Sequence, residues 1–312
     1  MNPMSISLMP LSLLFYLLVK LRRFGYRIRL LRSSRLAVTT LVVGNITLGG
    51  NGKTPIVIAL YQLLSKQGYK PAIITRGYKS GQEHRVQILR GGQTLPGVGD
   101  EANMMSEICA CPIGVGGDRV ASARQILKEF PEVDIILSDD GLQHYALQRD
   151  IEVAVCRFLA LGNGLMIPAG PLREPRSRLQ QVDVCINRDS DEVMETLGEP
   201  WQLIDPTVSK SIADFQGQQV HALAGIGFPE IFFASLRQME IDVIEHEFPD
   251  HHEFSAEDIN LKPALPILVT HKDAVKLKGI ASENIWVVPL QIELSDQLSQ
   301  QILGLVEERH RG

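Results

Sequence analysis

The stretch that most constrains what this chain can fold into is a glycine-rich segment, residues 44–55, which reads GNITLGGNGKTP. It follows the largely apolar run Leu36–Val43 and precedes the helix-like segment Ile56–Gln67. Glycines let the backbone turn several N–H groups toward one anion, and the helix that follows adds the positive end of its dipole. Strand, glycine-rich turn, Lys-Thr and helix together predict a loop that binds the phosphates of a nucleotide.

Two side chains at the end of this segment have the chemistry such a site needs. The Lys53 ammonium would reach the β- and γ-phosphates, and the Thr54 hydroxyl would ligate Mg²⁺. The strict pattern GxxxxGK[ST] requires glycine at position 47, where this chain has Thr47. The alternative is a glycine-rich turn that binds nothing. The expected phosphate-binding residues of the loop are Gly49, Gly50, Asn51, Gly52, Lys53 and Thr54.

The composition is that of an ordinary globular protein. With 312 residues, 45% of them hydrophobic and 21% charged, the chain can bury a large core and is expected to form two domains. Its four cysteines form no C-x-x-C pair, which argues against a zinc site or a disulfide framework and favours reduced thiols.

The charge is distributed unevenly along the chain. No Asp or Glu precedes Glu83, so residues 1–82 carry a charge of +12 although the whole chain carries -5. A positively charged N-terminal part of this kind favours an anionic partner. Nucleic acid is not expected, because the chain shows no recognisable binding module and no aromatic platform.

The N-terminal segment suggests which anionic partner this is. Residues Ile6–Val19 are nearly all apolar, but the run is too short to span a bilayer comfortably and Pro10 interrupts it. The positive charges follow the apolar run, whereas a secretory signal places them before it. Three readings stay open: an interfacial anchor with arginines on lipid phosphates, a short span with its C-terminal side in the cytoplasm, or a helix packed on the core.

The rest of the chain has the alternating pattern of an α/β protein. Apolar, strand-like runs alternate with helical or loop stretches, which predicts a parallel sheet, and the pattern restarts after about residue 215. We therefore expect a membrane-association region over residues 1–35, a P-loop nucleotide-binding α/β domain over 36–215 and a smaller α/β domain over 216–312. The expected strands are Leu36–Val43, Pro71–Thr75, Val133–Leu137, Ile151–Val155, Val182–Ile186, Val220–Ala224, Val243–Phe248, Ile267–Val269 and Ile285–Pro289.

Acidic residues follow one of these runs and also a Gly/Pro-rich loop. Asp139 and Asp140 come at the end of an apolar strand, where a nucleotide-binding sheet holds Mg²⁺, although either could instead cap a turn. Asp100 and Glu101 could be catalytic or could simply begin a helix. The segment Asp250-His251-His252 is compatible with a loop cap, a metal cluster or an acid/base pair.

Ordered motifs give the chain a resemblance to the tetraacyldisaccharide 4'-kinase family of lipid A biosynthesis, from the N-terminal apolar helix almost to the C-terminus. The motifs are Val43-Gly44-Asn45, Gly49-Gly50-Asn51-Gly52-Lys53-Thr54-Pro55, Thr75-Arg76-Gly77-Tyr78, Gly99-Asp100-Glu101, Asp139-Asp140-Gly141-Leu142-Gln143-His144, Pro168-Ala169-Gly170-Pro171-Leu172-Arg173-Glu174-Pro175, Ala224-Gly225-Ile226-Gly227, Asp250-His251-His252 and Lys272-Asp273-Ala274-Val275. The family usually has Glu where this chain has His271, so no role that needs a negative charge is assigned there.

The resemblance implies transfer of the γ-phosphoryl group of ATP to the 4'-hydroxyl of tetraacyldisaccharide 1-phosphate, forming lipid IV-A. It implies that Asp100 is the base, paired with His251 in preference to His252. The other implied roles are Mg²⁺ ligation by Thr54, Glu101, Asp139 and Asp140, and phosphate contacts by Arg76, Arg119 and Arg173.

The same resemblance implies a place and a partner. An acylated glucosamine disaccharide 1-phosphate stays in the bilayer, so the enzyme is expected at the cytoplasmic face of the bacterial inner membrane, as a peripheral or monotopic protein. No obligate protein partner is expected. The alternatives are a P-loop GTPase or metallochaperone-type switch and a non-enzymatic membrane-docked scaffold; the sequence shows no clear N-K-x-D guanine motif in the expected place.

Overall fold

The computed structural model describes residues 3–49, 52–77, 85–190, 192–280 and 282–310. Contacts divide the chain into two units, one of residues 1–194 and 293–312 and one of residues 195–292. Both are mixed α/β units built on largely parallel sheets, as expected from the alternating apolar runs.

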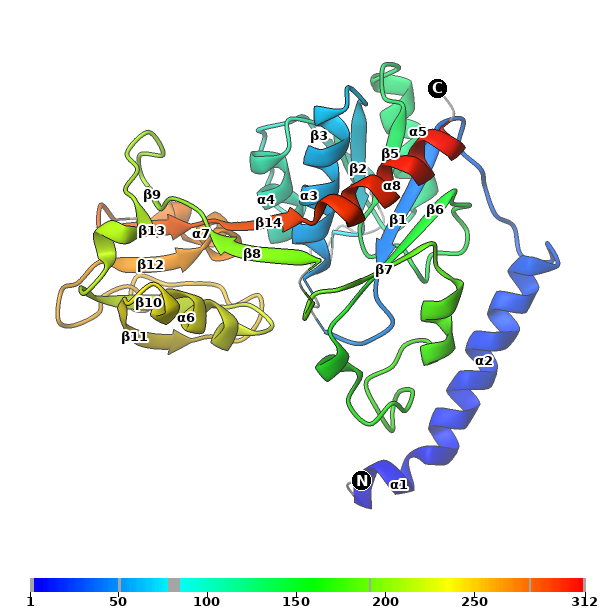
Figure 1. Ribbon diagram of the computed structural model, residues 1–312, viewed down its shortest axis with the longest axis horizontal. Coiled ribbons are helices and arrows are strands. Elements are labelled where there is room, and N and C mark those ends of the chain that lie inside the picture. Colours follow the sequence, from blue (N-terminus) through cyan, green and yellow to red (C-terminus); the bar gives the residue numbers. More distant parts are fainter. Residues whose placement is uncertain (1–2, 50–51, 78–84, 191, 281, 311–312) are drawn as a thin grey trace. The chain divides into compact units, whose positions relative to one another are not determined.

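The larger unit is organised around a seven-stranded sheet with the order β3-β4-β2-β5-β1-β6-β7 (Figure 1). All neighbours in it pair in parallel except β3, which is antiparallel to β4 at one edge. The strands are β1 (Thr39–Gly44), β2 (Pro71–Thr75), β3 (Gln87–Leu89), β4 (Ile113–Val115), β5 (Ile135–Ser138), β6 (Ile151–Cys156) and β7 (Val184–Asn187).

Strands β1, β2 and β5 are buried along their whole length, which explains why they read as continuous apolar runs. The helices of the unit are α3 (Lys53–Lys66), α4 (Asp100–Ile108) and α5 (Arg119–Glu129), with η1 (Phe158–Leu161) and η2 (Arg176–Gln181) after β6. On one face, Ala123 and Ile126 of α5 pack against Ile74 and Ile136 of the sheet. The β1-loop-α3 connection places the glycine-rich segment at the carboxyl ends of the strands, where ligands of such sheets bind.

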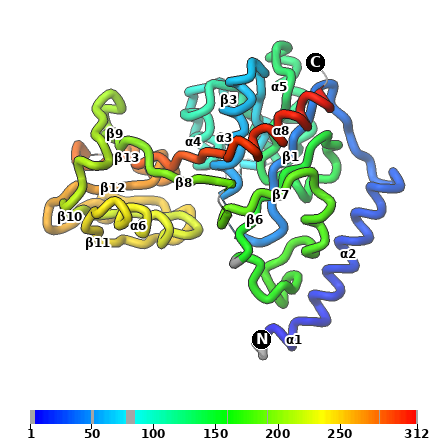
Figure 2. The backbone as a smooth tube through the Cα atoms, in the orientation of Figure 1, coloured from blue at the N-terminus to red at the C-terminus, as the bar shows by residue number. Residues whose placement is uncertain are grey.

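The C-terminal helix α8 (Asp296–Arg309) belongs to the larger unit, although the sequence placed it in the C-terminal domain. Figure 2 shows it returning to the strands of that unit. The Arg309 guanidinium donates to the backbone oxygen of Asp150 at 2.6 Å and to Asp183 Oδ1 at 2.7 Å. Contacts between residues far apart in the chain produce no periodic pattern in the sequence. The domain boundary expected at residue 215 therefore differs from the observed division, in which the smaller unit covers residues 195–292.

The smaller unit has a five-stranded sheet with the order β11-β10-β12-β13-β9, parallel except for β9. Its two faces pack separately: Ala222 and Trp286 face Phe233 of α6, whereas Leu223 and Val287 face Leu277 of α7. Its elements are β9 (Trp201–Gln202), η3 (Ile212–Phe215), β10 (Gln219–Ala224), α6 (Pro229–Gln238), β11 (Asp242–Glu247), β12 (Ile267–Thr270), α7 (His271–Leu277), η4 (Lys278–Ile280) and β13 (Ile285–Val288). The chain passes between the units through β8 (Val193–Leu197) and β14 (Leu290–Leu294), which pair.

The N-terminal segment forms α1 (Pro3–Ser7) and the longer α2 (Met9–Arg27). One side of α2 docks on the larger unit: the Ser12 hydroxyl donates to the backbone oxygen of Met166 at 2.7 Å, and Phe15 and Val19 pack against a cluster that includes Ile46. Its other side is apolar and exposed, through Leu11, Leu13, Leu14, Leu17, Leu18, Leu21 and Phe24. Among the described residues, no helix combines the length and apolarity that crossing a bilayer requires.

Candidate active site

The glycine-rich loop enters α3 through a backbone conformation that favours glycine. Gly52 precedes α3 at φ 65°, and Gly49 has φ 91°. Lys53 begins α3, and its Nζ lies 3.5 Å from Asp140 Oδ1. Gly50 and Asn51, which the sequence places in the phosphate-binding loop, lie outside the described residues.

Asp139 lies opposite this helix start, directly after β5. Its carboxylate is 2% exposed, and the Thr54 hydroxyl donates to its Oδ2 at 3.3 Å. The other oxygen, Oδ1, is buried and has no hydrogen-bond partner among the described residues. Burial, and then the nearby Glu101 and Asp140 carboxylates, raise the pKa of Asp139 to about 7. A bound cation would offset the cost of burial and the repulsion from both carboxylates, so Asp139 fits the metal role that the sequence assigned to it.

Asp140 has the opposite electrostatic situation. Arg173 donates to both of its carboxylate oxygens, at 2.9 and 3.2 Å, and the Lys53 ammonium lies 3.5 Å from one of them. Burial favours the neutral acid, but Lys53, Arg173 and Arg119 outweigh it, and the pKa of Asp140 lies well below its ordinary value. Asp140 is therefore an anchor for cationic side chains that phosphate would also attract.

The segment that carries Arg173 folds directly against the glycine-rich loop. The Leu48 N–H donates to the backbone oxygen of Pro171, and the Arg173 N–H donates to that of Ile46, each at 2.7 Å. Arg173 also contacts the side chain of Asn45. Two motifs about 120 residues apart in the chain thus form one wall of the site, as shared ligand binding requires.

Arg119 is buried at the first position of α5, where Asp118 caps the helix by accepting from the Ala121 N–H at 3.0 Å. Burial lowers the pKa of Arg119, while Asp140 and Asp139 oppose this effect. Arg76 and Arg173 also act on it electrostatically, so the three arginines that the sequence assigned to phosphate lie near one another.

Asp100 and Glu101 begin α4 after Gly99, which has φ 93°. Both carboxylates are half-buried, and Glu101 is close enough to Asp139 to raise its pKa. The N-terminus of α4 therefore faces the same centre. Its dipole favours anions there, which explains why two acids are tolerated side by side.

Arg188 is a member of this site that the sequence reasoning missed. It follows β7 and is 7% exposed, and its guanidinium lies so close to Gly52 that a Cβ at that position would overlap it. Glycine at position 52 is thus required twice, by its positive φ and by this approach. The sequence signal that could have identified Arg188 was its position directly after a strand of the expected parallel sheet.

Glu174 is a second buried residue to which the sequence assigned no role, although it belongs to the motif of residues 168–175. It is 1% exposed and accepts from Tyr145 Oη at 2.8 Å and from Gln143 Nε2 at 3.0 Å. Its carboxylate also lies 3.5 Å from Arg178 and 3.7 Å from Arg23 of α2. This buried network holds the Arg173 segment in place and connects it to α2.

The Asp250-His251-His252 segment belongs to the smaller unit, and its two histidines differ. His252 Nε2 lies 3.2 Å from Asp258 Oδ2, and its ring stacks on Phe248 with centroids 4.6 Å apart. His251 has φ 66° and lies 3.7 Å from Asp250, whose other oxygen accepts from Lys272 at 2.9 Å. His252 therefore contacts both Asp258 and Phe248, whereas His251 lies beside Asp250. Asp100 lies in the larger unit, so its pairing with His251 stays a prediction.

The Lys272-Asp273 motif has a structural explanation within the smaller unit. Asp273 is fully buried; its Oδ2 accepts from the Thr270 hydroxyl at 2.7 Å and from the Gly225 N–H at 3.0 Å, and its Oδ1 lies 2.7 Å from Lys276. Asp273 thereby ties the start of α7 to the Gly225 loop after β10. The neighbouring His271 packs its ring against Trp201.

The described residues do not form a group of three or more His, Cys, Asp or Glu side chains arranged around one metal position. Mg²⁺ on a nucleotide differs from such sites because phosphate oxygens and waters supply most of its ligands. One hydroxyl and one or two carboxylates are then sufficient. The Thr54–Asp139 pair with its unpartnered Oδ1 meets that requirement.

Comparisons with known proteins identify one family. The family model described as LpxK, tetraacyldisaccharide-1-P 4'-kinase, matches residues 4–307. Two curated relatives are named tetraacyldisaccharide 4'-kinase. The one from Methylobacillus flagellatus is 42% identical over 95% of this chain and 90% of its own length, and the one from Azoarcus sp. is 43% identical over 97% and 92%.

A solved structure is similar as well. It is the crystal structure of the "apo" form of LpxK from Aquifex aeolicus in complex with ATP, with a TM-score of 0.82, 25% identity, and coverage of 97% of this chain and 99% of that one. Sequence and fold thus agree, and the chain belongs to the tetraacyldisaccharide-1-P 4'-kinase family.

Proposed function

We propose residue roles and a membrane setting for the family's reaction, in which this ATP-dependent kinase transfers the γ-phosphoryl group of ATP to the 4'-hydroxyl of tetraacyldisaccharide 1-phosphate and forms lipid IV-A. The observation that carries the proposal is the convergence of Lys53, Thr54 and Asp139 at the carboxyl ends of β1 and β5. A nucleotide switch is not favoured, because the family and its curated relatives are named as kinases.

The triphosphate of ATP would lie along the glycine-rich loop and the N-terminus of α3, with Gly49, Gly50, Asn51 and Gly52 offering backbone N–H groups. Lys53 would leave Asp140 for the β- and γ-phosphates, which are stronger anions. Arg76, Arg119 and Arg173 would neutralise charge that spreads over the transferred group. Buried Arg119 loses no further hydration when it does so.

Thr54 and Asp139 would hold Mg²⁺, with Glu101 and Asp140 acting directly or through water. When bound, this cation neutralises phosphate charge and fixes the in-line geometry of transfer. Phosphoryl transfer requires mainly positioning and electrostatic stabilisation, which this set of residues can supply.

Asp100 would accept the proton of the 4'-hydroxyl as that oxygen bonds to the γ-phosphorus and the bond from phosphorus to the bridging oxygen of ADP breaks. His251 would assist Asp100, because a neutral imidazole can take or relay a proton near neutral pH. The engagement of His252 with Asp258 and Phe248 supports His251 as the partner.

The reaction itself is tested by incubating the detergent-solubilised protein with γ-labelled ATP, Mg²⁺ and tetraacyldisaccharide 1-phosphate. We expect label in the lipid fraction, and a loss of about 10³-fold in the Lys53→Ala variant because a charge contact at the transferred phosphoryl group is removed. Nucleotide hydrolysis without any labelled lipid would contradict the kinase assignment and favour the switch.

The two histidines give a paired prediction. His251→Ala is expected to lower kcat by about 100-fold, as is usual for removal of a proton-transfer partner. His252→Ala should lower kcat by less than about threefold and act mainly on the stability of the smaller unit, because its ring packs between Phe248 and Phe254. The measurement is kcat together with thermal denaturation of both variants. A larger rate loss at position 252 would reverse the assignment.

Arg188 gives a prediction that depends on the tertiary structure. Because its guanidinium lies against Gly52, Arg188→Gln should raise the KM for ATP by about tenfold, the effect of one charge-assisted hydrogen bond to phosphate. The matched control is Arg124→Gln on α5, whose guanidinium donates only to the Ser34 hydroxyl among the contacts described. Equal KM values for the two variants would exclude Arg188 from the nucleotide site.

The N-terminal region would bring the enzyme to its lipid at the cytoplasmic face of the inner membrane. The exposed leucines of α2 would enter the interface while the docked side keeps α2 on the larger unit. A peripheral or monotopic attachment follows from this proposal. It requires neither nucleic acid nor an obligate protein partner.

A further inference from the structure

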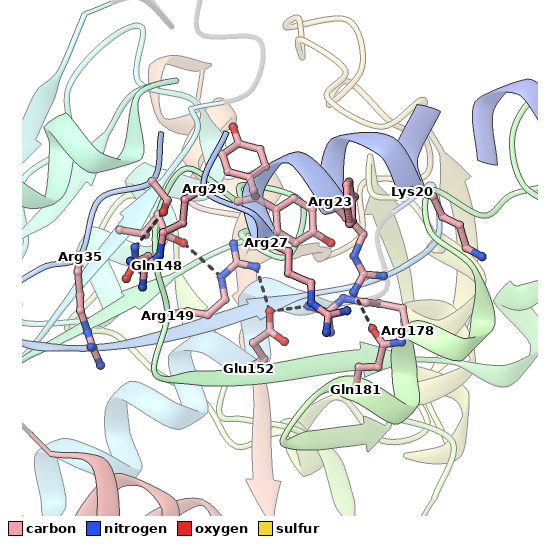
Figure 3. A pocket seen from close by; sticks show the side chains of 15 residues that line it. Lys20, Arg23, Arg27, Arg29, Arg35, Gln148, Arg149, Glu152, Arg178 and Gln181 are labelled. Carbon is pink, nitrogen blue, oxygen red and sulfur yellow. Dashed lines mark hydrogen bonds and ion pairs between the residues drawn. The ribbon is translucent and has the colours of Figure 1, made fainter. Parts of the chain in front are cut away.

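A cavity of about 900 Å³ opens beside α2, and none of its lining residues is assigned to ATP. Seven basic side chains and one carboxylate, Glu152, line the part of it that the structure describes. Figure 3 shows the Glu152 carboxylate joined to Arg149 and Arg178, and the Arg23 guanidinium joined to Gln181. The basic lining residues are Lys20, Arg23, Arg27, Arg29, Arg35, Arg149 and Arg178.

The floor of the cavity is neutralised from within the protein. Arg178 and Arg149 both bond to Glu152 Oε1, at 2.5 and 2.9 Å, and only 3% and 10% of their side chains are exposed. Arg149 also donates to the backbone oxygens of Leu142 and His144. These bonds fix the floor, as a preformed binding site requires.

The rim of the cavity is not neutralised. No carboxylate of a described residue lies within ion-pair distance of Lys20, Arg27 or Arg29. A backbone turn fixes the segment that carries these groups. Helix α2 ends after Arg27, Arg29 has φ 62°, and the Leu31 N–H donates to the backbone oxygen of Gly25 at 3.1 Å. Like charges held together at a cavity mouth attract an anion from outside the protein.

The surroundings of the rim indicate what carries that anion. Leu17, Leu21 and Phe24 of the same helix are each more than half exposed, next to the basic residues in the sequence. A free anion would make no contact with this apolar surface. A lipid, by contrast, would place its acyl chains on the apolar surface and its phosphate at the arginines. Planar guanidinium groups bind phosphate oxygens in pairs, which favours arginine for such a site.

We propose that this cavity binds the phosphate ester of an anionic membrane lipid headgroup, with the acyl chains along the exposed face of α2. The inference rests on the proposed membrane setting and adds a defined site to it. Its consequence is that α2 recognises a headgroup, in addition to the apolar attraction that any interfacial helix has.

The test uses the full-length protein and short-chain phosphatidic acid below its critical micelle concentration, so that no charged surface is present. Calorimetric titration of the wild type should show saturable binding, and short-chain phosphatidylcholine should not bind. Arg27→Gln/Arg29→Gln should weaken the affinity at least about tenfold. The matched control, Arg22→Gln/Arg32→Gln, removes the same charge from exposed neighbours that do not line the cavity, and should change affinity less than about twofold.

Three results would overturn the proposal: no saturable binding, equal losses in the two double variants, or inorganic phosphate binding as tightly as the lipid. The labelled-ATP assay run on the same proteins separates this failure from failure of the kinase assignment, because transfer by the wild type without lipid binding removes only the cavity proposal. The KM for the acceptor distinguishes two lipid sources. A raised KM in the cavity variant identifies the acceptor's own phosphate as the occupant, and an unchanged KM identifies a membrane phospholipid.

Discussion

Asp100→Asn is expected to lower kcat for lipid phosphorylation by about 10³-fold while ATP binding stays within about twofold of the wild type. The amide keeps the shape of the side chain at the start of α4 but cannot accept the proton of the sugar hydroxyl. The measurement is kcat with labelled ATP, together with the dissociation constant of a nonhydrolysable ATP analogue.

Helix stabilisation is the competing explanation for Asp100, because an acid at a helix N-terminus interacts favourably with the dipole. Asp296→Asn is the matched control, since Asp296 also occupies the first position of a helix, α8, outside the proposed site. Both variants should lose a similar, small amount of thermal stability, and only Asp100→Asn should lose turnover. Normal turnover of Asp100→Asn would exclude it as the base.

Asp139→Asn should have opposite effects on activity and on stability. Activity should fall at least about 100-fold, because the buried carboxylate oxygen proposed for Mg²⁺ is lost. Without nucleotide or metal, however, the variant should be more stable by about 1–2 kcal/mol, or a few degrees in Tm, because burial and the neighbouring carboxylates disfavour the ionised wild-type group.

The pH dependence of this stability difference follows from the sign of the pKa shift. The pKa of Asp139 is raised to about 7 in the folded protein, above the value of about 4 of an unfolded aspartate. The folded state then holds the proton more tightly, so the cost of the wild-type carboxylate is absent below about pH 4 and develops fully as the pH rises through about 7. Thermal denaturation at about pH 8 and pH 4 should show the gain of Asp139→Asn only at the higher pH.

The adjacent aspartate provides a control of opposite sign. Asp140 is bound by Arg173 and Lys53, and the pKa of its carboxyl is lowered, so Asp140→Asn should reduce Tm at about pH 8. Asparagine tolerates the backbone of Asp140, at φ 44°, so strain does not obscure the comparison. A fall in Tm for both variants would show that Asp139 is not held at an electrostatic cost.

Much of the fold could be predicted because burial on both faces leaves a direct trace in the sequence. Strands such as Pro71–Thr75 and Ile267–Thr270 read as short apolar runs and form where they were expected. The short edge strands Gln87–Leu89 and Trp201–Gln202 were missed, because a strand of two or three residues gives no periodic signal. The N-terminal helix packs on the larger unit along one side, as one of the three interpretations of this segment expected, and its exposed apolar side leaves membrane attachment a proposal.

The sequence by itself determined the class of the fold and predicted a nucleotide site, because glycine conformation, helix dipoles and Lys-Thr act within one short segment of chain. Only the tertiary structure decided which charges surround that segment. It placed Arg188 against Gly52, left one oxygen of Asp139 buried without a hydrogen-bond partner among the described residues, and formed a basic cavity between α2 and Arg149. Such contacts join residues more than a hundred positions apart, and their energies depend on distance and burial, which a linear pattern does not contain.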